Sequence, residues 1–105
     1  MTRLYPTFLL GLALALPGAL AAESAGPTGE MMGNTCAACH GTHGRLSGSA
    51  FVPLAGMDED EFIRAMREFR DNTRPSTLMH SVAKGFSDEE TRRMAEFFAA
   101  QTKEE

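Results

Sequence analysis

Apolar residues recur at helical spacing in two segments of the chain. In the first, Phe62, Met66 and Phe69 fall at positions i, i+4 and i+7, which places them on one face of a helix. Asp58 is suited to cap this helix, and Glu61, three residues later, completes a capping-box pattern. Acidic residues open the segment and arginines follow further along, the order that suits a helix dipole. The pattern predicts a helix that begins near Asp58.

The second segment begins at Ser87, where Glu90 completes another capping-box pattern. Its apolar positions include Met94, Phe97 and Phe98, again at helical spacing. The pattern predicts a helix near the end of the chain.

A third, shorter helix is expected from about Thr28 to Cys39. Gly29 and Gly33 lie within it, so intrinsic propensity alone would not hold it. Residues 41–57 are rich in Gly and Ser and predict an irregular loop. The sequence has no alternating apolar and polar stretch of useful length, which a half-buried strand would need. The predicted fold class is therefore all-α.

The first 21 residues have the three-part pattern of a secretory signal. Arg3 gives a positive start, residues 8–16 form a short apolar run, and Ala19-Leu20-Ala21 fits a cleavage site between small residues. The alternative is a membrane anchor, but the apolar run is far shorter than the roughly 20 residues that span a bilayer. We expect residues 1–21 to be removed on export to the periplasm, leaving residues 22–105 as one domain without a membrane span.

Length and composition indicate one small globular domain that needs a cofactor. The chain has 105 residues, 43% of them hydrophobic, and a net charge of −4. It has no stripe of Lys and Arg that would neutralise phosphates, so nucleic acid is not an expected partner. A domain of residues 22–105 is close to the limit of about 70–80 residues below which one core seldom suffices. A disulfide between Cys36 and Cys39 would close a very small loop and stabilise little, so we expect a bound cofactor to complete the core.

The chemistry is concentrated in Cys36-Ala37-Ala38-Cys39-His40. C-x-x-C-H is the attachment signature of c-type haem. Positions i and i+3 of a helical turn project to one side, so both thiols can bond to the two vinyl groups of one haem. His40 follows at once and can reach the iron from the proximal face. We predict one covalent haem c held by Cys36, Cys39 and His40.

The cysteine pair has two other interpretations, a thioredoxin-like dithiol and a zinc site. A thioredoxin-like dithiol also places C-x-x-C at the start of a helix, but that fold needs a β-sheet that this sequence does not predict. A zinc site could use Cys36, Cys39 and His40 or His43, but the chain has no second C-x-x-C to complete a closed set of ligands.

A haem iron of this type takes a second axial ligand. The candidates are the remaining methionines and histidines of the chain after the signal: Met31, Met32, Met57, Met66, Met79, Met94, His43 and His80. Met66 and Met94 lie on apolar helix faces, where Met usually packs in a core. Met31 and Met32 precede the haem motif on the proximal side, Met57 is placed to staple the start of a helix, and His43 is too near His40 to reach the opposite face. Met79 and His80 remain, and both lie far enough along the chain to cross the haem edge.

The chain resembles class I cytochromes c. More narrowly, residues 36–44 (CAACHGTHG) and 76–87 (STLMHSVAKGFS) are similar to the cytochrome subunit of flavocytochrome c sulfide dehydrogenases. The similarity extends over about residues 30–101. It implies a small class I cytochrome c fold whose first and last helices cross, and Met79 as the distal iron ligand.

The resemblance also implies details of packing around the haem. Where the helices cross, Gly33 would lie against Phe97 or Phe98. The family's proximal histidine donates to a carbonyl in a Gly-Pro pair, which corresponds here to Gly48-Ser49, with Pro53 as the nearest proline. The remaining apolar residues are expected to wall the haem: Leu54, Phe62, Ile63, Met66, Phe69, Leu78, Val82 and Met94.

His/Met ligation points to electron transfer. A thioether is a weak, soft donor, so it raises the reduction potential relative to two histidines, and six-coordination blocks substrate access. The expected protein is therefore an electron carrier and not itself an enzyme. The resemblance implies the role of a cytochrome subunit that accepts electrons from an FAD flavoprotein sulfide dehydrogenase and passes them to other cytochromes. The alternatives are a freely diffusing cytochrome that shuttles between respiratory or photosynthetic complexes, and a haem sensor or peroxidase.

Overall fold

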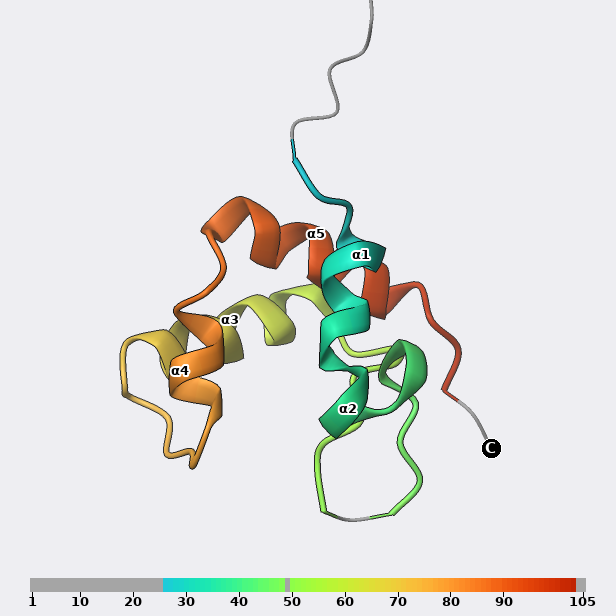
Figure 1. Ribbon diagram of the computed structural model, residues 1–105, viewed down its shortest axis with the longest axis horizontal. Helices are drawn as coiled ribbons and strands as arrows, with labels where there is room; N and C mark the ends of the chain where they lie inside the picture. Colours follow the sequence, from blue (N-terminus) through green and yellow to red (C-terminus); the bar gives the residue numbers. More distant parts are fainter. Residues whose placement is uncertain (1–25, 49, 104–105) are drawn as a thin grey trace, which may run out of the picture.

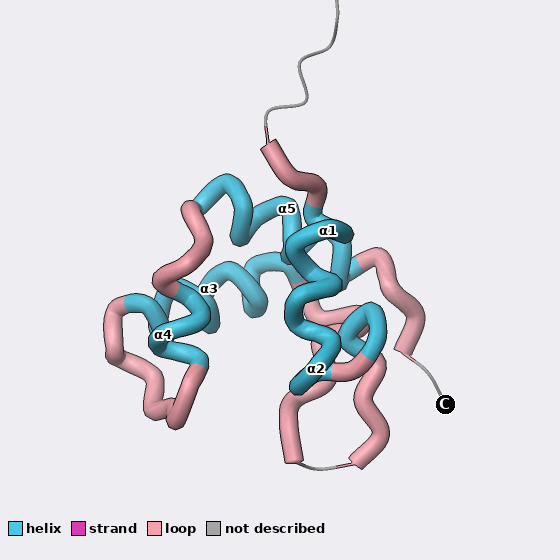
Figure 2. The backbone as a smooth tube through the Cα atoms, viewed as in Figure 1, coloured by secondary structure: helices cyan, strands magenta, loops and turns pink. Residues whose placement is uncertain are grey.

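The computed structural model describes residues 26–48 and 50–103, and the predicted signal at residues 1–21 lies outside this part. The described residues fold into helices and loops without a β-strand (Figures 1 and 2). The α-helices are α1 (Gly29–Gly33), α2 (Ala37–His40), α3 (Glu59–Arg70), α4 (Met79–Ala83) and α5 (Asp88–Ala99), with 3₁₀ turns at Asn34–Cys36 and Thr42–Gly44. The all-α prediction is confirmed. None of the described helices combines the length and apolar character needed to cross a bilayer.

The predicted helix from about Thr28 to Cys39 is present, but it is not a uniform α-helix. Thr28 caps its start, because the Thr28 hydroxyl accepts the Met31 N–H at 3.1 Å. Helix α1, the 3₁₀ turn and α2 follow one another without a gap up to His40. The 3₁₀ turn tightens the backbone just where Cys36 stands.

Both longer helices begin where their caps predict. The Asp58 carboxylate accepts the Glu61 N–H at 3.1 Å at the start of α3. Helix α5 begins with a complete capping box, in which Ser87 accepts the Glu90 N–H and the Glu90 carboxylate accepts the Ser87 N–H.

Helix α4 was not predicted. It has five residues and no side-chain cap at Leu78, so it carries little sequence signal. The Ser76 hydroxyl supports its first turn by accepting the His80 N–H at 3.0 Å.

The core lies where α5 meets α1 and α3. Met94 and Phe98 of α5 are fully buried, and the Phe98 ring lies 5.5 Å from that of Phe62 on α3. The buried apolar set is Met32, Leu54, Ala55, Phe62, Met66, Ala83, Met94, Ala95 and Phe98. Burial of Met66 and Met94 confirms their predicted role in packing.

Two glycines one helical turn apart let α1 cross α5 closely. A Cβ atom at Gly33 would lie 2.7 Å from Cδ1 of Phe97 and 3.2 Å from Cζ of Phe98. The predicted contact of Gly33 with an aromatic residue is therefore confirmed, and Phe97 is the nearer of the two. A Cβ atom at Gly29 would lie only 2.1 Å from the Arg93 carbonyl oxygen, so Gly29 contacts α5 through backbone.

The long loop between α2 and α3 (Figure 2) is fastened at its base. The Gly44 carbonyl accepts the N–H groups of both Leu54 and Ala55, at 2.9 and 3.1 Å. The Gly56 N–H donates to the Phe98 carbonyl at 2.8 Å, which ties the end of the loop to α5. These bonds hold the second half of the loop, including Val52, near the end of α2.

Candidate functional site

The two cysteines lie on one continuous helical stretch. Cys36 ends the 3₁₀ turn and Cys39 lies in α2. Both are free thiols and partly buried. Since i and i+3 positions face the same way on a helix, the two sulfurs are placed to act on one group.

The Cys36 thiol does not have the character of a reactive dithiol. Burial raises its pKa, with a smaller rise from Cys39 and an opposing effect of the Thr35 hydroxyl. A thioredoxin-like site instead lowers the pKa of its attacking cysteine. The raised pKa leaves the Cys36 thiol protonated at neutral pH, unlike the attacking cysteine of such a site.

His40 is held in one orientation by the loop. Its Nδ1 lies 2.6 Å from the Val52 carbonyl oxygen, and because a carbonyl only accepts, the ring proton is on Nδ1. The Nε2 lone pair is then left for a metal. The Phe51 ring packs edge-on to the imidazole at 6.0 Å.

The structure corrects the expected partner of His40. The acceptor is Val52, which precedes Pro53, whereas the expected Ser49 lies outside the described residues. The residue before a proline is restricted to extended conformations, which favours a fixed carbonyl direction at Val52.

Met79 is the first residue of α4 and is partly buried against the core. Its neighbour His80 is engaged elsewhere, with Nδ1 3.2 Å from the Ser76 hydroxyl. Helices α2 and α4 stand apart from one another (Figure 1). Met79 and the cysteine-bearing turn therefore come from separate parts of the fold, as two opposite ligands of one planar group would.

The other candidate ligands have different surroundings. Met31 is 64% exposed, whereas Met32 is buried in the core. His43 packs edge-on to Phe97, with the ring centres 5.9 Å apart. Met57 packs against the edge of the core, consistent with its expected position at the start of α3.

Several apolar side chains near the candidate ligands are left uncovered. Phe51 is 51% exposed, Val52 61% and Leu78 57%. Leu78 was expected to wall the haem, and the polypeptide alone does not bury it. A flat apolar group between the loop and α4 would cover such side chains. Together with two thiols, an imidazole nitrogen and a thioether, the residues present fit a haem.

The described residues do not favour a zinc site. Within residues 26–48 and 50–103, no three or more His, Cys, Asp or Glu side chains gather in a group that could hold a metal ion. The donor set of two thiols and one imidazole is therefore incomplete for zinc in this part of the chain.

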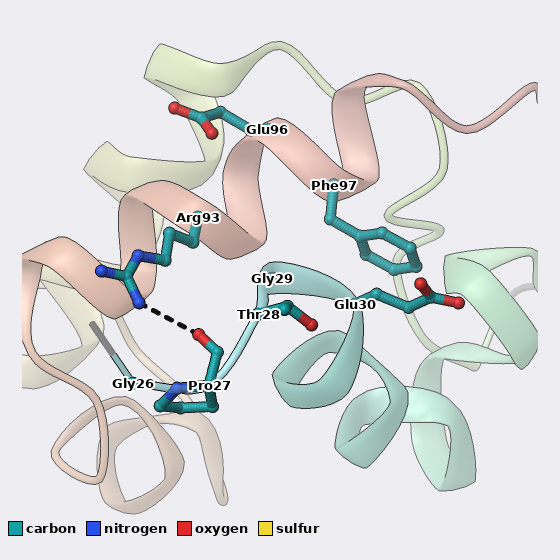
Figure 3. A pocket seen from close by; sticks show the side chains of 8 residues that line it. All are labelled: Gly26, Pro27, Thr28, Gly29, Glu30, Arg93, Glu96 and Phe97. Carbon is teal, nitrogen blue, oxygen red and sulfur yellow. Dashed lines mark hydrogen bonds between the residues drawn. The ribbon is translucent and has the colours of Figure 1, made fainter. Parts of the chain in front are cut away.

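One hollow in the described part of the chain lies outside this site. It has a volume of about 500 Å³ and lies beside the crossing of α1 and α5, between the Gly26–Glu30 segment and Arg93, Glu96 and Phe97 (Figure 3). Arg93 Nη1 donates to the Pro27 carbonyl at 3.1 Å across it. None of the predicted ligands lines it.

Comparisons with known proteins agree with the donor set. No family model matches the chain. Over 70 residues it is 37% identical to the cytochrome subunit of sulfide dehydrogenase from Chlorobaculum tepidum, covering 67% of this chain and 63% of that protein. Over 67 residues it is 39% identical to the thiosulfate dehydrogenase electron acceptor of Stutzerimonas stutzeri, covering 61% of this chain and 31% of that protein. The chain thus spans less than two thirds of these two relatives.

A third relative is matched over most of its length. Cytochrome c-554(548) of Halomonas halodenitrificans is 32% identical over 76 residues, which cover 70% of this chain and 92% of that protein. These relatives are named as cytochromes and as an electron acceptor. Cytochromes c bind haem c covalently. The all-helical fold and these similarities together show that the chain belongs to the class I cytochrome c family.

Proposed function

We propose that this chain is an exported, single-haem cytochrome c that carries one electron at a time in the periplasm. One observation carries the proposal: the C-x-x-C-H turn presents two thiols beside an imidazole whose Nδ1 is fixed on the Val52 carbonyl. The sequence has one such motif and no other cysteine, which supports a single haem. Bound haem supplies a reversible one-electron couple.

The protein's own residues would set the properties of that couple. Cys36 and Cys39 form the thioether bonds, and His40 is the proximal ligand. The hydrogen bond to Val52 orients the imidazole and raises its basicity. Met79 is the distal ligand, and its soft sulfur favours the reduced state.

The electron donor that fits best is an FAD flavoprotein that oxidises sulfide. Two relatives support a dehydrogenase partner, since one is a cytochrome subunit of sulfide dehydrogenase and the other an electron acceptor for thiosulfate dehydrogenase. Other cytochromes would then accept the electron. A freely diffusing carrier is the second candidate, because the relative matched over 92% of its length is named simply as a cytochrome.

The partner is tested by isolating the exported protein, carrying a C-terminal tag, from its native host under mild conditions. The flavoprotein proposal predicts that an FAD protein co-purifies at a fixed ratio and that sulfide reduces the haem only when that protein is present. Isolation as a monomer, with reduction by sulfide unaffected by the flavoprotein, would contradict it and favour the free carrier.

Met79→Ala is expected to abolish the weak near-red absorption band of the ferric protein, because that band requires methionine sulfur on the iron. The loss of a ligand that favours the reduced state should also lower the reduction potential. An optical spectrum of the oxidised, exported protein measures the first effect, and a redox titration measures the second.

Met31→Ala is the matched control, since Met31 is 64% exposed and should leave both properties unchanged. Survival of the band in Met79→Ala would place the distal ligand on another methionine, and absence of the band from the unsubstituted protein would favour His80.

A further inference from the structure

A second hollow, of about 260 Å³, is lined by residues of α3, α4 and α5 and by none of the proposed haem ligands. Arginines from two of these helices line it: Arg67 and Arg70 on α3 and Arg92 on α5. Its volume is several times the roughly 30 Å³ that one water occupies in the liquid. The hollow can therefore hold a small polyatomic ligand.

The three guanidinium groups differ in their ion-pair and hydrogen-bond partners. Arg70 donates to the Asp88 carboxylate at 2.7 Å. Arg92 pairs with Glu89 and Glu96 of its own helix. For the Arg67 guanidinium, the described part of the chain shows neither an ion pair nor a hydrogen bond, only a longer-range interaction with Asp88.

The charge lining the hollow favours an anion. Three guanidinium groups and one carboxylate, Asp88, line the hollow, and Glu89 and Glu96 neutralise Arg92, so the excess positive charge is that of Arg67. Arg70 lowers the pKa of Asp88, so this carboxylate stays charged at neutral pH and offsets one of the three cations. A guanidinium carries five N–H donors, and Arg70 uses one of them on Asp88, which leaves donors for a ligand.

The remaining lining is apolar. Ile63, Met66 and Ala83 contribute to the hollow, and Met66 and Ala83 are buried. The charged groups themselves are open to solvent, since Arg67 is exposed and the Asp88 side chain is 78% exposed, so added salt should weaken the binding of an anion. The Thr91 hydroxyl donates to the Ser87 carbonyl, so the arginines are the donors available to an anion.

We propose that this hollow binds a small tetrahedral oxyanion such as sulfate or phosphate. Arg67 contributes the main free charge, Arg70 contributes its unused N–H groups, and Asp88 limits the affinity by repulsion. None of the proposed haem ligands lines this hollow, although it shares Ile63 and Met66 with the expected wall of the haem, and the proposal does not depend on which protein donates the electron.

The test is an NMR titration of the reduced, exported holoprotein with sodium sulfate and, separately, sodium phosphate, at an ionic strength held constant with sodium chloride. We expect saturable shifts of the Ala83 and Thr91 amide signals, with a Kd in the millimolar range. Arg67→Gln should weaken binding by about three- to tenfold, as expected for loss of a hydrogen bond to a charged group near the surface.

Two further variants make the result specific. Arg64→Gln is the matched control, because Arg64 lies on the same helix, pairs with Glu68 and does not line the hollow; its Kd should be unchanged. Asp88→Asn should bind sulfate more tightly, since it removes the repelling carboxylate. The proposal is overturned if neither anion gives saturable shifts, if Arg64→Gln weakens binding as much as Arg67→Gln, or if Asp88→Asn does not tighten it.

Discussion

Residues 22–105 produced without haem are expected to be poorly ordered in solution. Within residues 26–48 and 50–103, Met94 and Phe98 are the only large side chains that are fully buried, so this part of the polypeptide has a small core of its own. Haem would bury several hundred Å² of porphyrin, which contributes on the order of 10 kcal/mol gross at ~25 cal/mol/Å². Typical net stabilities are only about 5–15 kcal/mol, so loss of this contribution should unfold most of the chain.

Far-UV circular dichroism measures this effect directly. The haem-free chain is made in the cytoplasm without residues 1–21, and the control is the exported holoprotein of the same sequence. The control should show the helical spectrum of α3 and α5, whereas the haem-free chain should lack it. A native-like helical spectrum without haem would show that the helices do not depend on the cofactor.

Gly29→Ala is expected to lower the free energy of unfolding by about 2–3 kcal/mol, the upper part of the range of about 1–3 kcal/mol that is typical of overpacked sites. The new methyl group would lie 2.1 Å from the Arg93 carbonyl oxygen and 2.7 Å from its carbonyl carbon. These are backbone atoms inside α5, so they cannot turn aside as a side chain can. The crossing of α1 and α5 must open, and this weakens the packing that holds the haem-binding turn.

Gly33→Ala is the matched comparison, because Gly33 lies one turn further along the same stretch. Its methyl group would meet the rings of Phe97 and Phe98, which can shift. Denaturant unfolding of the holoproteins should give a smaller loss for Gly33→Ala than for Gly29→Ala. An equal or larger loss at Gly33 would mean that the aromatic contacts, and not the backbone contact, set the distance between the helices.

The sequence was most informative about the two long helices. Their apolar spacing and the caps at Asp58 and Ser87 are local signals, and the structure places both helices accordingly. Helix α4 was missed because a helix of five residues without a side-chain cap has too short a pattern. Ser76, which accepts the His80 N–H, was the one local sign of its start.

Features that depend on contacts between distant segments were harder to predict. The family resemblance predicted that His40 donates to a carbonyl in Gly48-Ser49. The His40 Nδ1 instead donates to the carbonyl of Val52, twelve residues away. Pro53 was the available signal, because it restricts the residue before it. The convergence of Arg92 with the arginines of α3 is not visible in either helix alone, since it arises only when α5 packs on α3.

The central claim is that haem is attached through Cys36 and Cys39, and mass spectrometry of the exported protein tests it most directly. After denaturation, reduction and proteolysis, the peptide containing Cys36 and Cys39 is expected to carry the added mass of one haem, with neither thiol open to alkylation. The Cys36→Ala/Cys39→Ala double variant should carry none. The same peptide from the unsubstituted protein at its bare polypeptide mass, with both cysteines alkylated, would contradict the account.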